Sequence, residues 1–188
     1  MVREYVSLTT LFLHNMSSLI LQKKIQLYDY SFGSFCLHQI KVDEDSIDKS
    51  NTSKEKSKTF FHLLLKSRFL INPIYQADEG QLFGPFLLDK LKFSDLLEID
   101  IKSLSETLNK VIESTIVKDS REQVIDNTVF RDTAKMILAM SNLNNASCYK
   151  LSLEDANGCV WGLNPYYFFY SFFVFGTDQI SIIQLFSD

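Results

Sequence analysis

Glycine is scarce in this chain, and its placement excludes one large class of nucleotide-binding protein. The six glycines stand singly along 188 residues, and the pattern G-x-x-x-x-G-K-[ST] is absent. A phosphate-binding loop needs clustered glycines so that backbone N–H groups can surround the phosphates. Nucleotide hydrolysis by a P-loop enzyme is therefore not expected.

Cysteine and histidine are also sparse. The chain has an odd number of cysteines, and no two of them form a Cys-x-x-Cys pair; they are Cys36, Cys148 and Cys159. The three histidines lie in separate segments. Neither a disulfide framework nor a zinc site is indicated. A cysteine in an apolar strand is more often a small core residue than a reactive thiolate. We therefore predict no catalytic, cofactor-binding or metal-ligating residue, and a reducing compartment.

The chain lacks an excess of basic residues. Its formal net charge is -4 and its pI is about 5.4. Proteins that grip nucleic acid through phosphates need basic surface, so direct nucleic-acid binding is not expected. The first residues also lack the unbroken hydrophobic region of a secretory signal. These features favour an intracellular protein, cytoplasmic or nuclear.

A long aliphatic run is missing as well. Residues 156–177 carry no formal charge and are long enough in principle to cross a bilayer. Glycine, asparagine and proline interrupt the first half, and the dense remainder is aromatic where a membrane span would be rich in Leu, Ile and Val. A membrane-embedded protein is disfavoured, and a carboxyl-terminal membrane anchor is kept as an alternative.

What the sequence does hold is aromatic side chains, including 16 Phe and 8 Tyr. They concentrate between Trp161 and Phe175, and a second apolar run covers residues 180–186 after the Gly176-Thr177-Asp178-Gln179 turn. Two apolar runs joined by such a turn predict a β-hairpin. The carboxyl-terminal stretch from residue 148 onward is therefore expected to form the core sheet.

The amino-terminal part predicts a second hairpin. Period-two alternation runs from residue 25 to residue 42, with a bulge or turn at Gly33-Ser34. For residues 6–21 the apolar spacing fits a helix and a strand equally.

Residues 43–58 (DEDSIDKSNTSKEKSK) hold a single hydrophobic residue, Ile47, and predict a flexible polar linker. We interpret it as an insertion within a single domain spanning residues 1–188, in preference to a domain boundary. Its hydroxyl groups are candidate regulatory phosphorylation sites; they belong to Ser46, Ser50, Thr52, Ser53 and Ser57.

Three helices are expected between the two hairpins. Thr59 can cap a buried helix over residues 60–70, and apolar spacings of three and four predict helices over residues 103–117 and 128–141. Strands at both ends of the chain with helices between them predict an α+β fold, in which a mainly antiparallel sheet is covered by helices.

The aromatic run has two interpretations. A continuous apolar strand is typical of a sheet centre buried on both faces. Alternatively, its aromatic side chains divide between the core and an exposed protein-binding face, for which Trp161, Tyr167 and Phe169 are the candidate residues. We expect Trp161, the only tryptophan, to be an anchor packed against the helix that carries Phe60, Phe61 and Leu64.

One family resemblance rests on these residues. The stretch EDANGCVW at residues 154–161, followed by Asn164 and YFFY at 167–170, resembles the acidic turn, tryptophan and aromatic strand of the Maf-type repressors of RNA polymerase III. The order of parts is similar too: a small amino-terminal portion, a polar linker, and a second portion opening with a helix. The chain departs from that pattern at Pro165, in a longer hairpin, and in residues 172–179, where the family has basic residues.

The sequence thus favours a non-enzymatic regulator or complex subunit that acts through protein partners, and the resemblance implies repression of RNA polymerase III transcription. No cofactor is expected, and neither a protein partner nor a small-molecule ligand is identified. An enzyme whose site is assembled only in three dimensions is the second alternative.

Overall fold

The computed structural model describes residues 19–29, 33–43, 52–67, 69–70, 80–100, 102–106, 108, 146–153 and 168–187. Trp161, Tyr167, the segment 44–51 of the expected linker, the rest of the helix expected over 103–117 and the helix expected over 128–141 lie outside these residues.

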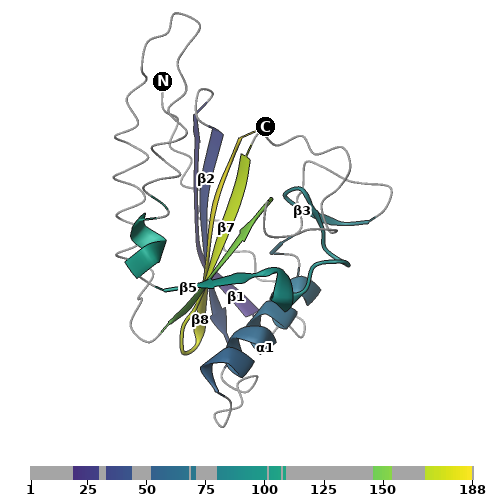
Figure 1. The fold of residues 1–188 in the computed structure, drawn as a ribbon, viewed down its shortest axis with the longest axis vertical. Helices are drawn as coiled ribbons and strands as arrows, with labels where there is room; N and C mark the ends of the chain where they lie inside the picture. The colour runs from purple at the N-terminus through teal and green to yellow at the C-terminus, as the bar shows by residue number, and fades with distance from the viewer. Residues whose placement is uncertain are drawn as a thin grey trace, which may run out of the picture.

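A six-stranded sheet organises the described residues (Figure 1). The strand order is β1-β2-β8-β7-β6-β5, and every neighbouring pair is antiparallel. The strands are β1 (Leu19–Asp29), β2 (Gly33–Val42), β5 (Leu97–Ile99), β6 (Ser147–Ser152), β7 (Phe168–Phe175) and β8 (Gln179–Ser187). The amino-terminal and carboxyl-terminal hairpins meet in this sheet where β2 pairs with β8. The predicted combination of helices with a mainly antiparallel sheet is confirmed.

Both predicted hairpins are present. In the carboxyl-terminal one, β7 and β8 pair from Phe168↔Ser187 to Phe175↔Ile180, and the turn is closed where the Gly176 N–H donates to the Gln179 carbonyl at 2.8 Å. In the amino-terminal one, β1 and β2 pair with a register shift between Leu21 and Lys23. β1 begins at Leu19, so residues 19–21 of the segment 6–21, which fits a helix and a strand equally by its spacing, form a strand.

Helix α1 (Ser53–Lys66) begins earlier than predicted. Thr52 caps it: the Glu55 N–H donates to Thr52 Oγ1 at 3.3 Å, and the Thr52 N–H donates to Glu55 Oε2 at 2.9 Å. This reciprocal pair satisfies two N–H groups that the first helical turn leaves without partners. Residues 53–58 are therefore helical, and the expected linker boundary at residue 58 and the cap at Thr59 were wrong.

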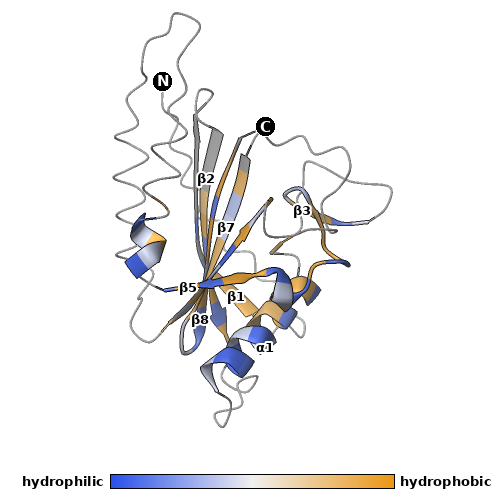
Figure 2. Ribbon diagram, viewed as in Figure 1, coloured by the Kyte–Doolittle hydropathy of each residue, from blue (hydrophilic) through white to orange (hydrophobic). Residues whose placement is uncertain are grey.

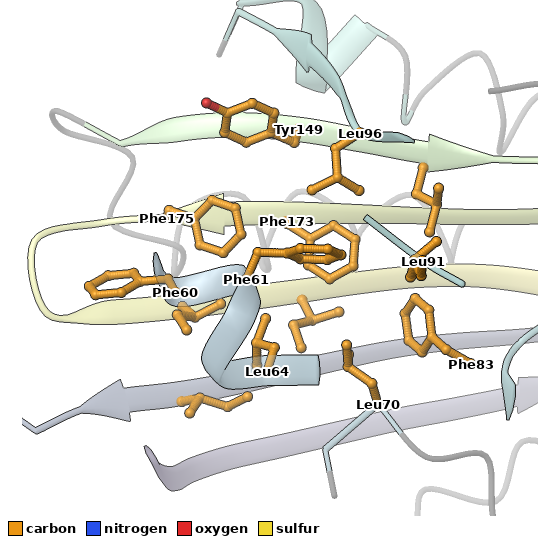
Figure 3. Close-up of a cluster of buried hydrophobic side chains, with 14 of the residues drawn as sticks. Phe60, Phe61, Leu64, Leu70, Phe83, Leu91, Leu96, Tyr149, Phe173 and Phe175 are labelled. Carbon is orange, nitrogen blue, oxygen red and sulfur yellow. The ribbon is translucent and has the colours of Figure 1, made fainter. Parts of the chain in front are cut away.

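One face of α1 packs on the sheet. Phe60 lies against Phe175 with ring centroids 6.3 Å apart, and Phe61 meets Phe173 edge-on at 5.4 Å. Figure 3 shows these rings converging with Leu64 between the helix and the strands. The opposite side of α1 is polar, which gives the helix its mixed colours in Figure 2. We call the face of the sheet that α1 covers the helix face.

A small hairpin extends the cover on the helix face. β3 (Leu82–Phe83) and β4 (Phe86–Leu87) pair across Gly84-Pro85, and the short 3-10 helix η2 (Phe93–Asp95) leads into β5. No helix or strand was predicted for this segment. The hairpin is held by its Phe side chains, which are buried in the same cluster as Phe61.

The other face of the sheet is buried too. Leu37, Phe172 and Ile183 alternate with the helix-face residues of their strands, and each is 0% exposed. Residues 102–106 are helical, as predicted for the start of that helix, and Leu104 is fully buried. β7 is thus a strand buried on both faces from Ser171 to Phe175, as the continuous apolar run predicted.

Candidate functional site

Of the three predicted protein-binding residues, Phe169 alone lies within the described residues. Phe169 is 2% exposed, and its ring lies 5.6 Å from that of Phe83, 5.5 Å from that of Phe86 and 6.2 Å from that of Phe186. It is a core residue of this fold, and a partner could not reach it without moving the β3–β4 hairpin. Trp161 and Tyr167 lie outside the described residues, so their role as a protein-binding pair stays a prediction.

Exposed apolar side chains lie instead at the two edges of the sheet. Within the described parts of the chain, the large hydrophobic residues with substantial exposure are Ile20 (57%), Leu21 (38%) and Leu97 (50%). Ile20 and Leu21 belong to β1, and Leu97 belongs to β5. These are the first and last strands in the sheet order, so within the described residues each edge presents apolar surface beside backbone groups that no further strand pairs with.

The β1 edge combines apolar and basic residues. Ile20 and Leu21 are consecutive and therefore point to opposite faces of the sheet. Lys23 and Lys24 follow the register shift, opposite Gln39 and His38 of β2. Lys24 is exposed. We call residues 20–24 of this strand the β1 edge.

The β5 edge is short and acidic. β5 has three residues, and its Glu98 is exposed next to Leu97. Asp100 follows directly, where its carboxylate accepts hydrogen bonds from the Ser103 hydroxyl and N–H, both at 2.7 Å. The hydrogen bond from the Ser103 hydroxyl is the main cause that lowers the pKa of the Asp100 carboxyl. This edge therefore carries negative charge at neutral pH.

A row of polar side chains crosses the middle of the helix face. Ser171 on β7 is opposite Gln184 on β8, and Gln184 is opposite Cys36 on β2. Ser171 is 0% exposed, and its hydroxyl has no hydrogen-bond partner among the described residues. His38 lies two residues from Cys36 on the same strand and therefore faces the same side. This row is the nearest approach to a chemical constellation among the described side chains.

The protonation states in this row do not favour nucleophilic chemistry. Burial raises the pKa of the Cys36 thiol to about 12, which keeps it in the unreactive thiol form at neutral pH. Burial, with a smaller effect of Lys24, lowers the pKa of His38 to about 4, so its imidazole is neutral. Cys148, on the other face of the sheet, also has a pKa raised by burial, to about 11. A thiolate–imidazolium pair is therefore disfavoured.

The described residues bear on two further kinds of site. They hold no group of three or more His, Cys, Asp and Glu side chains that could bind a metal ion. They also include no helix of the length and apolar character needed to cross a membrane. Of residues 156–177, the alternative anchor, positions 168–175 form strand β7.

Comparison with known proteins adds no relative. No protein-family model, no curated protein and no solved structure matches this chain.

The two apolar edges were not predicted from the sequence, because the exposure of a strand depends on which strands end the sheet. A usable signal was Ile20-Leu21 followed, after Gln22, by two lysines, a combination of apolar and charged residues that is typical of edge strands.

Proposed function

We propose that this chain is a non-enzymatic regulator or complex subunit that acts through protein contacts inside the cell, in the cytoplasm or nucleus. The observation that supports this best is the position of the exposed apolar side chains, Ile20, Leu21 and Leu97, on the two edge strands. An edge strand with apolar side chains and pairable backbone is a surface onto which another chain can add a strand.

Repression of RNA polymerase III transcription is the specific form of this proposal. Its support is the resemblance of residues 154–170 to the Maf-type repressors and the similar order of parts. Purified chain added to an RNA polymerase III transcription reaction should reduce the RNA product and leave an RNA polymerase II reaction unchanged. Equal effects on both polymerases, or none at molar excess, would reject this form.

The general proposal has its own test, which does not depend on the polymerase. Tagged full-length chain is captured from its native cells beside two variants, Ile20→Lys/Leu21→Lys and Leu97→Lys. A stoichiometric partner should be retained by the unmodified chain and lost from at least one edge variant whose circular dichroism is unchanged. A partner held equally by all three chains would remove the edge strands from the proposal.

The enzyme alternative has one observation in its favour, the shared face of Cys36, His38, Gln184 and Ser171. The raised pKa of Cys36 and the lowered pKa of His38 oppose it, because a nucleophilic pair needs the thiolate form. Alkylation by iodoacetamide at neutral pH discriminates. Cys36 in the folded chain should react far more slowly than in urea, whereas an activated thiol would react rapidly when folded.

A further inference from the structure

The two edges of the sheet differ in length and charge, and the difference points to the chemistry of a partner. β1 runs for 11 residues and carries Lys23 and Lys24, whereas β5 runs for three and carries Glu98. We propose that the β1 edge binds an extended peptide segment of a partner protein, and that this segment has two acidic residues followed by two apolar ones. This deepens the proposed function and rests on it.

The backbone of β1 is suited to adding a strand. One side of β1 pairs with β2 from Leu19↔Val42 to Asp29↔Gly33, and its other side ends the sheet in the described part of the chain. In an antiparallel sheet, alternate residues of an edge strand direct their N–H and C=O groups outward. A partner strand can therefore continue the ladder, and antiparallel addition keeps the pattern of every other pair in this sheet.

The side chains of β1 specify the order of residues in that partner. Leu21 pairs with Ile40, which is buried with α1, so Leu21 lies on the helix face and Ile20 on the other. The register shift then places Lys24, opposite His38, on the helix face as well. On the helix face Leu21 is thus followed by Lys24, and in the register Lys23 stands next to it, opposite Gln39. An antiparallel partner meets the lysines first, which requires acidic residues before apolar ones.

Charge complementarity favours such a peptide over a second copy of this chain. A symmetric antiparallel pair that used all of β1 would be centred on Lys24 and would place this residue opposite its own copy. Like charges directly opposite one another destabilise a strand pair. The acidic β5 edge of another copy has the right charge, but its three residues match only part of β1.

The test uses a labelled peptide, Thr-Glu-Glu-Thr-Ile-Val-Thr, and fluorescence anisotropy with the full chain. Binding should be weakened about tenfold or more by Ile20→Lys/Leu21→Lys and by Lys24→Glu. Leu97→Lys is the control on the other edge, because it replaces a half-exposed leucine with the same type of residue, and it should leave binding unchanged. The peptide Thr-Lys-Lys-Thr-Ile-Val-Thr should prefer the Lys24→Glu variant over the unmodified chain.

Several outcomes would overturn the inference. They are equal binding of the acidic and basic peptides, equal loss in the Leu97→Lys variant, or no binding by a chain with native circular dichroism. Sedimentation that shows self-association abolished by Ile20→Lys/Leu21→Lys would assign the β1 edge to a second copy and would also overturn it. If a cellular partner is nevertheless lost from the β1 variant, the proposed function stands and only the acidic chemistry is rejected.

Discussion

Gly84 lies directly over the ring of Phe169, so closely that a β-carbon at position 84 would overlap with the ring atoms. Gly84 also has φ of +55°, in the left-handed region that side chains with a β-carbon disfavour. The β3–β4 turn can therefore cover the aromatic strand only because this residue has no side chain. Phe83 and Phe86, on either side of the turn, pack against the same ring.

Gly84→Ala should destabilise the fold strongly. The left-handed backbone costs about 1–2 kcal/mol for a residue with a β-carbon, and overpacking adds typically about 1–3 kcal/mol. Urea denaturation followed by circular dichroism measures the change in the free energy of unfolding. Gly80→Ala is the control, since φ there is +148° but the nearest atom to an added β-carbon is 3.9 Å away. A Phe169→Leu change should partly rescue Gly84→Ala; equal costs at both glycines and no rescue would contradict the overlap.

The edge-on contact of Phe61 with Phe173 should couple α1 to the sheet. Their ring planes are 87° apart, a favoured geometry for aromatic pairs. Phe61→Ala should lower the free energy of unfolding by about 3–5 kcal/mol, because both side chains are fully buried. In a double-mutant cycle with Phe61→Leu and Phe173→Leu, the coupling should be about 0.5–1.5 kcal/mol.

His62 provides the control for that experiment, because it is the next residue of α1 and is exposed. His62→Ala should change stability by no more than about 0.5 kcal/mol. If the two Phe→Leu changes were strictly additive, the ring geometry would contribute nothing beyond buried area.

Much of the sheet could be predicted from the sequence, because its strands carry local signals. The turn at Gly176 and the alternation from residue 25 both indicate hairpins without reference to the rest of the chain. The pairing of β2 with β8 joins residues that are far apart in sequence, and only the need to bury both hairpins in one sheet suggested it.

Other features were missed for physical reasons. The start of α1 was not predicted, because residues 53–58 are polar and resemble a linker in composition. Only the Thr52-x-x-Glu55 capping box indicates a helix there. β5 is too short for an alternation signal. The exposed β1 edge and the buried polar row are properties of strand order, which no local pattern of residues contains.

The structure contradicts the interpretation of Ser57 as a regulatory phosphorylation site. It was a candidate phosphorylation site, but it is 1% exposed and its hydroxyl donates to the Ser53 carbonyl at 2.9 Å. Ser53 and Thr52 are exposed, although their hydroxyls also contact Ser147 and Glu55. Because Ser57 is buried in α1, a kinase cannot reach its hydroxyl while the helix is folded.

Ser171→Ala should leave stability unchanged or raise it. The Ser171 hydroxyl is fully buried without a hydrogen-bond partner, and an unpaired buried hydroxyl costs about 1–3 kcal/mol by mutational measures. Ser57→Ala is the comparison, because that change removes a hydrogen bond, and it should be the less favourable of the two. Thermal unfolding of both variants measures the difference. A loss of more than about 1 kcal/mol for Ser171→Ala would mean that the hydroxyl has a polar partner.

His38 should make the fold sensitive to mild acid. Its pKa is lowered from the ordinary value of 6.5 to about 4, chiefly because the ring is largely shielded from water and secondly because Lys24 is nearby. Between pH 6.5 and 4 the unfolded chain therefore binds a proton at this residue that the folded chain does not. The stabilisation is complete above pH 6.5 and is lost as the pH falls toward 4, by roughly 3 kcal/mol in all.

Urea denaturation at a series of pH values, for the unmodified chain and for His38→Gln, isolates this effect from the carboxylates that titrate below about pH 5. The difference between the two free energies of unfolding should shrink by up to about 1.4 kcal/mol for each pH unit below 6.5. Lys24→Ala should raise the pKa of His38 and reduce the acid sensitivity, as NMR titration of the imidazole would show directly. Parallel pH curves for the unmodified chain and His38→Gln would contradict the lowered pKa, because the residue would then bind its proton equally in both states.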